Sequence, residues 1–241
     1  GLTFTLIWVP AVTFQFGPNS DTRTATITRG YWIGKHEVTW AQVNAYASTG
    51  AKNSIGAQEH TDTVVETGLE EENVPLEEPI PAPDESSAIR ITWVDARRFC
   101  AWLGLRLPTE AEWELAARGP RKRRFPWGDH ELKSGGFNSR NADPFPYTAP
   151  PGSFPEDRSP YGCMDMAGNV QEWVFDAWAD LPDGALVDYR GPSEDPTERR
   201  VVRGGAWNHL YLRTFETTYR FKRLTHYVHR EVGFRVCLTG P

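Results

Sequence analysis

Arg203-Gly204-Gly205-Ala206-Trp207-Asn208 and, near the end of the chain, Val232-Gly233-Phe234-Arg235-Val236 are the two blocks that decide the fold of this protein. The adjacent glycines of the first block interrupt regular structure, yet they lack the spacing of a phosphate-binding loop. The apolar second block is typical of a buried final strand. We therefore expect the two blocks to form a framework on either side of the tract 208–232.

The tract 208–232 is rich in Tyr, Phe, His, Leu and Arg, which follow neither a helical nor a strand period. Core residues should be periodic, whereas these residue types give a binding surface large contacts at a small entropic cost. The tract is therefore predicted to be an exposed surface that binds a protein or another macromolecule. The candidate contact residues are His209, Leu210, Tyr211, Arg213, Phe215, Tyr219, Phe221, Leu224, His226, Tyr227, Val228 and His229.

The composition fits a loop-rich globular protein. The 241 residues are 39% hydrophobic, enough for a substantial core, and they include 10 Trp, 21 Gly and 19 Pro. Many Gly and Pro residues predict short elements joined by long, shaped loops. No apolar run reaches the length of a membrane span, so none is expected. The cysteines, Cys100, Cys163 and Cys237, lack metal-ligand spacing, and Cys100 is predicted to be a small buried hydrophobe.

The net charge of −6 is unevenly placed along the chain. Ten acidic residues and no Lys or Arg lie between Glu59 and Glu85, and this composition predicts a mobile insertion at about 51–87. Nine basic residues lie between Glu198 and Arg235. A basic end can indicate nucleic-acid binding. We favour pairing of these arginines with core carboxylates, and we expect no nucleic-acid partner.

Local signals predict the secondary structure. Strands are expected within 2–16, 22–28 and 30–34, and turns with short strands from about 125 to 197. Threonine N-caps predict helices from Trp40 to Ala47, from Thr92 to about Leu103, and from Thr109 to Gly119.

Several segments resemble the formylglycine-generating enzyme (sulfatase-modifying factor) family, in the same order as in that family. They are Tyr31–Thr39, Leu105–Glu114, Phe125–Gly128, Met166–Trp173 and the two blocks quoted first. The resemblance implies a single α+β domain over 1–241 with a C-type-lectin fold: two helices, a small twisted antiparallel sheet and much ordered loop. The fold alone does not transmit the activity.

The family oxidises its substrate with two copper-binding cysteines that follow the RGG block. Here the aligned positions hold His209 and Thr214. We therefore expect neither a redox cofactor nor enzymatic activity. Two alternatives stay open: a divergent oxidase or metal-dependent enzyme, for which no HExxH or similar motif exists, and a binding module with one fixed ligand.

The resemblance also implies two structural calcium sites, since calcium prefers carboxylate, amide and carbonyl oxygens. The first would use Asp165, the carbonyls of Gly168 and Val170, and Glu172; the second would use Asn138, the carbonyl of Ser139, Asp143 and the carbonyl of Phe145. The alternative is that these polar residues only hydrogen-bond the backbone of their loops.

The composition of the tract 208–232 is similar to the variable region of diversity-generating retroelement variable proteins, which use the same fold. Randomised adenines in AAC codons give Phe, Tyr, Leu, His, Arg, Val, Thr and Asn, but never Lys, Glu, Gln, Met or Trp. All the candidate contact residues belong to the reachable set. Glu216, Lys222 and Glu231 do not, and would belong to the scaffold.

Overall fold

The computed structural model describes residues 2–18, 20–50, 83–132, 135–140, 143–192, 198–226 and 228–241. Residues 51–82 lie outside this part, so the mobile insertion stays a prediction. The end of the predicted insertion at 83–87 is described, and there Ser86 and Ser87 are buried. The Ser87 hydroxyl donates to Glu37 Oε2 at 2.5 Å. These last residues therefore belong to the packed domain.

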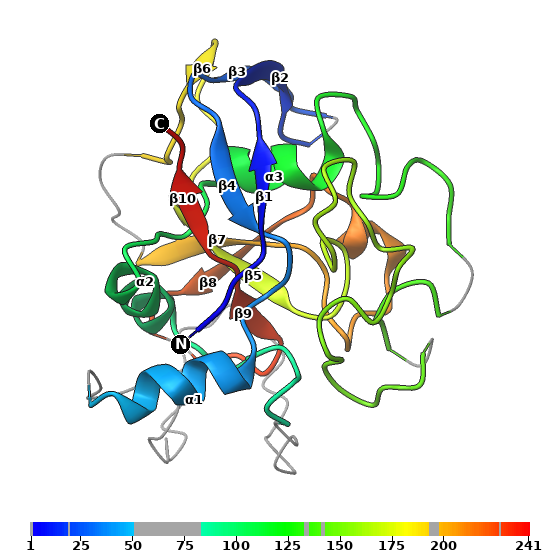
Figure 1. Cartoon of the computed structure of the whole chain (residues 1–241). Coiled ribbons are helices and arrows are strands. Elements are labelled where there is room, and N and C mark those ends of the chain that lie inside the picture. The colour runs from blue at the N-terminus through cyan, green and yellow to red at the C-terminus, as the bar shows by residue number, and fades with distance from the viewer. Residues whose placement is uncertain are drawn as a thin grey trace.

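The first two sheets are built mainly from the N-terminal strands (Figure 1). One has the order β1-β4-β10 and the other β2-β3-β6. Their strands are β1 (Leu6–Val9), β2 (Val12–Phe16), β3 (Arg23–Ile27), β4 (Tyr31–Gly34), β6 (Leu186–Val187) and β10 (Cys237–Thr239). The single strand expected over 2–16 is divided at Pro10, which has no N–H to donate to a sheet ladder.

The third sheet brings together the two framework blocks. Its order is β8-β7-β5-β9, with the strands β5 (Gln171–Ala177), β7 (Arg199–Arg203), β8 (Arg220–Leu224) and β9 (Val232–Phe234). Glu172 on β5 lies opposite Arg203 of β7 on one side and Gly233 of β9 on the other. The β5–β9 and β3–β6 pairs are parallel. The antiparallel pairing that the resemblance implied is therefore found only in part.

The helices begin at the predicted N-caps. They are α1 (Trp40–Ser48), α2 (Trp93–Trp102) and α3 (Glu110–Arg118), together with the 3₁₀ turn η1 (Leu212–Phe215). The caps are Thr39, Thr92 and Thr109, and Thr39 and Thr109 form complete capping boxes. The α+β, loop-rich fold class is confirmed, although the described residues contain three α-helices where the resemblance implied two.

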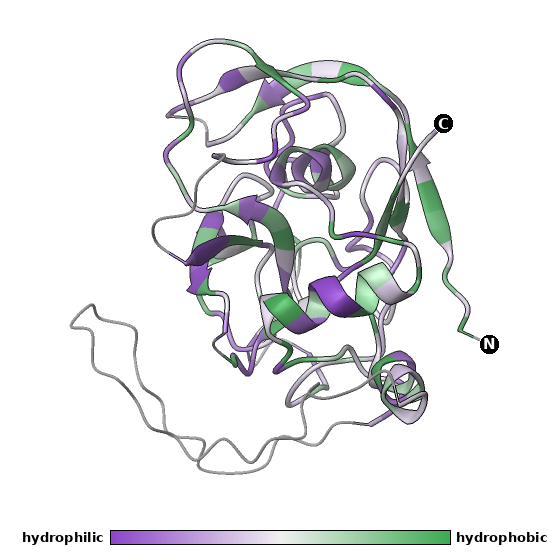
Figure 2. Cartoon of the chain, turned by 90° about the vertical axis from the view of Figure 1, so that its left-hand side faces the viewer, coloured by the Kyte–Doolittle hydropathy of each residue, from purple (hydrophilic) through white to green (hydrophobic). Residues whose placement is uncertain are grey.

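Helix α3 lies in the interior of the molecule, and all its residues are buried. Figure 2 shows hydrophilic and hydrophobic residues together on this helix, which is seen end-on in the upper half of the view. Arg203 from β7 is fully buried and bonds Glu110 Oε1 at 3.1 Å and Glu114 Oε2 at 2.6 Å. Arg118 also bonds Glu114, and Arg220 bonds Glu110. The expected pairing of C-terminal arginines with core carboxylates is thus confirmed.

Candidate ligand-binding surface

Part of the predicted contact set faces solvent. Leu210 is 61% exposed and Tyr211 is 72% exposed, just before η1. Arg213 and His226 are also exposed. Partly buried positions of the set are His209, Tyr219, Phe221, Leu224 and Val228, whereas Tyr227 lies outside the described residues. The structure therefore supports an exposed surface centred on the start of the tract.

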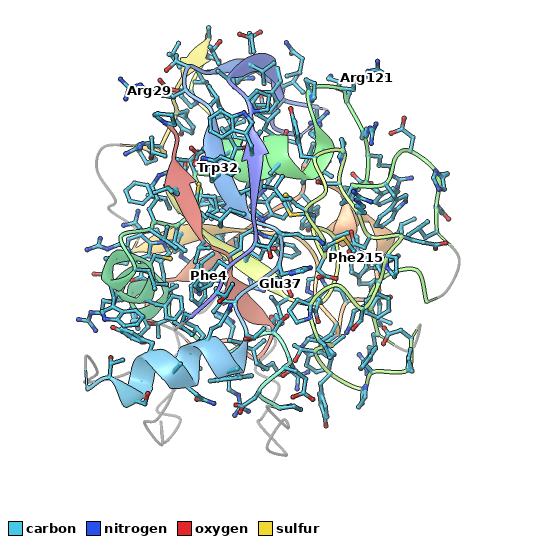
Figure 3. The ribbon with its side chains drawn as sticks, viewed as in Figure 1. Phe4, Arg29, Trp32, Glu37, Arg121 and Phe215 are labelled. Carbon is cyan, nitrogen blue, oxygen red and sulfur yellow. The ribbon has the colours of Figure 1, made fainter. Side chains whose placement is uncertain are left out.

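Phe215, which was predicted to contact a ligand, is part of the core, and its side chain is not exposed to solvent in this structure. The ring is 2% exposed, and its centroid lies 4.7 Å from that of Phe137. The turn η1 directs Phe215 inward, over Gly205, where a Cβ atom would lie 2.2 Å from the ring. Figure 3 shows Phe215 within the loop-rich half of the molecule. His229 is also buried, at 8% exposure.

The tract is also more regular than its sequence suggests. Residues 220–224 form β8, the edge strand of the third sheet, and Phe221 lies opposite Val202 of β7. An edge strand normally alternates between buried and exposed side chains. In β8, four of the five residues are partly buried and Lys222 is exposed. Burial therefore does not alternate along this strand, and its sequence does not show the period of a strand. The backbone of this segment is therefore fixed by sheet hydrogen bonds.

The positions expected to align with the family's cysteines, His209 and Thr214, carry no thiol. Burial lowers the pKa of His209 to about 4, so its imidazole is neutral at pH 7. The Thr214 hydroxyl donates to the carbonyl oxygen of Tyr211 at 2.7 Å. The chain's cysteines lie elsewhere: all are buried, and burial raises the pKa of Cys163 to about 11. No thiolate is therefore available at this surface.

Buried acids surround Arg235 beside the first predicted calcium set. Burial and the neighbouring carboxylates raise the pKa of Asp165 to about 8, and burial raises the pKa of Asp157 to about 7. Glu37, near the centre of Figure 3, accepts hydrogen bonds from the Asn169 amide at 2.5 Å and from Ser87. Glu37 lies within one of the segments that resemble the family. No role was predicted for it, because its partners Ser87 and Asn169 are distant along the chain.

The first predicted calcium set does not fit the ion. Arg235 donates to both carboxylate oxygens of Glu172 at 2.6 Å, and the Trp113 indole donates to Oε2 at 3.0 Å. Asp165 Oδ2 already accepts a hydrogen bond from the Gly152 N–H at 2.6 Å. Glu172 therefore serves as the partner of a buried arginine. A calcium ion bound to the carbonyls of Gly168 and Val170 would then have Asp165 as the one remaining carboxylate of this set.

The second set fits an oxygen-bound cation better. Asn138 is 1% exposed, and its Oδ1 atom has no hydrogen-bond partner among the described residues. Asp143 accepts from the N–H groups of Ser139 and Phe145 at 2.9 and 2.8 Å, but unlike Glu172 it has no ion pair to a Lys or Arg among the described residues. In the described residues, no three His, Cys, Asp or Glu side chains gather as a metal site, so amide and carbonyl oxygens would have to contribute.

The fold and these framework contacts define a formylglycine-generating-enzyme-type domain. The sequence profile of the sulfatase-modifying factor enzyme 1-like domain matches residues 3–239, and the chain belongs to this family. Within the described residues, no helix has the length and apolar character needed to cross a bilayer.

Curated relatives share part of the chain. The inactive C-alpha-formylglycine-generating enzyme 2 of Bos taurus is 36% identical over 132 residues, which cover 51% of this chain and 39% of the relative. The formylglycine-generating enzyme of Mycobacterium tuberculosis is 33% identical over 176 residues, which cover 64% of this chain and 57% of the relative. The chain thus spans less than two thirds of the length of either relative.

Solved structures share the fold over nearly the whole chain. Treponema denticola variable protein 1 has a TM-score of 0.74 at 23% identity, covering 98% of this chain and 95% of that protein. PvdO from Pseudomonas aeruginosa has a TM-score of 0.75 at 26% identity, covering 98% and 94%.

Proposed function

We propose that this protein is a non-catalytic, ligand-binding protein that displays a hypervariable surface at residues about 208–232. The observation that carries the proposal is the exposure of Leu210 and Tyr211, at 61% and 72%, at the start of the tract. Adjacent large side chains in solvent form an apolar patch, and such a patch favours a partner that covers it. The partner is a protein or another macromolecule.

The chemistry of the described site favours binding over catalysis. His209 and Thr214 replace the cysteines on which the family's oxidation depends, and each is held in a structural contact. Family membership alone is compatible with both catalysis and its absence, because the relatives include proteins named as enzymes and proteins named as inactive. A divergent oxidase would bind copper stoichiometrically. Our proposal expects no copper-dependent oxidation of a cysteine peptide and no stoichiometric copper binding.

The framework is suited to a surface whose side chains change. The tract is anchored by Arg203, whose guanidinium bonds the backbone oxygens of Thr217 and Thr218 as well as the carboxylates of α3. These bonds use main-chain atoms of the tract, so they do not depend on its variable side chains. The likeness of the fold to a solved variable protein supports the same proposal.

Sequencing the 3′ end of the gene across many cells of one population tests the hypervariability. We expect substitutions to cluster between His209 and His229, in asparagine-derived codons, with the flanking framework silent. The exposed positions Leu210 and Tyr211 should vary most, and Glu216 and Lys222 should stay constant. A tract as constant as the rest of the gene would contradict diversification and would favour a fixed ligand.

We also propose that Asn138, Ser139, Asp143 and Phe145 hold a structural calcium ion, which would supply charge neutralisation and cross-link the loop. Calcium at about a hundred times its dissociation constant stabilises a folded protein by about 2.7 kcal/mol, or on the order of 5–10 °C in Tm at this size. We expect that shift in wild type and its loss in Asp143→Asn. Asn44→Ala, which removes a surface contact to Asp84, should retain it. An unchanged Tm in wild type would contradict the site.

A further inference from the structure

An open cleft of about 570 Å³ is lined in part by the middle of the tract 208–232. Three chain segments form it: the turn between β2 and β3, the residues after β5, and the residues that lead into β8. The side chains that matter here are Asp21, Trp178, Asp180, Glu216, Tyr219 and Arg220. Only Tyr219 belongs to the predicted contact set, because no spacing in the sequence links these three segments.

The aromatic wall of the cleft attracts cations. Trp178 is partly buried, and its ring centroid lies 4.5 Å from the Arg220 guanidinium carbon and 5.4 Å from the Lys222 ammonium nitrogen. The negative face of an indole ring binds such groups. Tyr219 adds a second ring to the lining. The wall therefore accepts positive charge, and a ligand cation would have to displace the exposed Lys222 from the ring.

The lining carries three carboxylates and one guanidinium. Arg220 is bound to Glu110 at 2.6 and 3.0 Å, so a buried glutamate compensates its charge. Asp180 is exposed, and no ion pair to it occurs in the part of the chain that the structure describes. Glu216 bonds Arg124 through Oε1 and stays 23% exposed on its side chain. A carboxylate without a partner beside an aromatic wall is matched by a positively charged ligand group.

We propose that this cleft is a constant subsite that takes a lysine or arginine side chain of the protein ligand. The inference rests on the proposed binding function and specifies the chemistry of the partner. Trp178 and Asp180 lie outside the variable tract, so they would persist while neighbouring residues change. The cleft is open, which suits a side chain presented by a macromolecule better than an enclosed small molecule. Substitutions in the tract would then change the residues around the ligand's lysine or arginine side chain but would leave Trp178 and Asp180 in place.

The test uses N-acetyl-lysine methylamide as the probe and N-acetyl-norleucine methylamide as its uncharged counterpart. Binding is followed by NMR through the indole N–H signal of Trp178, which a Trp178→Phe variant assigns. We expect a saturable shift of this signal with the lysine probe and binding at least several-fold weaker with norleucine.

Substitutions of charged residues at the rim of the cleft test whether it prefers a positively or a negatively charged ligand group. Asp180→Asn should weaken the lysine probe about two- to five-fold, and Lys222→Gln should strengthen it by a similar factor because a like charge is removed. Both side chains are exposed, so neither change disturbs the core. The exposed residues Glu85 and Arg29 serve as matched controls, since Glu85→Gln and Arg29→Gln make the same charge changes elsewhere on the surface.

Three results would overturn the proposal. Equal binding of norleucine would show an apolar cleft. Stronger binding of N-acetyl-glutamate methylamide, weakened by Lys222→Gln, would show an anion subsite. Absence of any shift at Trp178 would show that the cleft holds no ligand group. Population sequencing does not measure binding at this cleft, so a failed probe experiment leaves hypervariability standing, and an invariant tract with a lysine-binding cleft would indicate a fixed binder.

Discussion

Replacing Arg203 with methionine is expected to lower the free energy of unfolding by about 3–5 kcal/mol. The guanidinium is 0% exposed and neutralises two carboxylates of α3, Glu110 and Glu114, which are themselves fully buried. Methionine fills a similar volume but leaves this negative charge undercompensated in the core. Urea denaturation followed by tryptophan fluorescence measures the loss.

The matched control is Arg98→Met on the surface of α2. Arg98 is 61% exposed on its side chain and lies 3.6 Å from Asp95, so its removal should change stability by no more than about 0.5–1 kcal/mol. Adding Glu114→Gln to Arg203→Met should recover part of the loss, because it removes one uncompensated charge. A loss for Arg203→Met as small as that of the control would show that Arg118 and Arg220 satisfy these carboxylates alone.

Phe215→Ala is expected to destabilise the protein by about 3–5 kcal/mol, whereas Tyr211→Ala should stay within about 0.5 kcal/mol of wild type. The two residues lie four positions apart in the same tract, yet Phe215 is 2% exposed and Tyr211 is 72% exposed. Removing the buried ring leaves a cavity against Phe137 and Gly205. Thermal unfolding by circular dichroism separates the two variants.

Ligand binding should depend on Tyr211 and not on Phe215, which is the reverse of their expected effects on stability. Tyr211→Ala combined with Leu210→Ala removes the exposed apolar contacts and should weaken capture of a ligand selected on this protein, with Tm nearly unchanged. A folded Phe215→Ala protein should retain that capture. If Tyr211→Ala instead lowered Tm strongly, Tyr211 would be a packing residue and the surface would need to be placed elsewhere.

The predictable parts of the fold were those set by neighbouring residues. Threonine followed three positions later by Gln42, Asp95 or Glu112 specifies a helix start locally, and all three starts were found. The parallel pairing of Gln171 with Val232 could not be predicted in this way, because it joins residues 61 positions apart. The fold class was predicted instead from the order of the segments that resemble the family.

Within the candidate site, composition alone could not separate exposed from buried aromatics. Tyr211 and Phe215 belong to the same compositional class, and only the turn η1 places one outside and the other inside. Similarly, Glu172 had the right type for a calcium ligand, but its bidentate bond to Arg235 depends on a residue 63 positions later. Burial and long-range pairing are properties of the packed chain.

The common register of β7, β5 and β9 fixes the two ends of the tract relative to each other. Arg203 and Gly233 both lie opposite Glu172, so the two residues that border the segment 204–232 are about two strand spacings, or roughly 10 Å, apart. Within the segment, β8 pairs with β7 and Phe215 packs in the core, so the path of the chain is fixed by backbone pairing and by a buried side chain. The segment between these residues is therefore held at both ends and at its middle, so a change in its length would have to be absorbed outside β8.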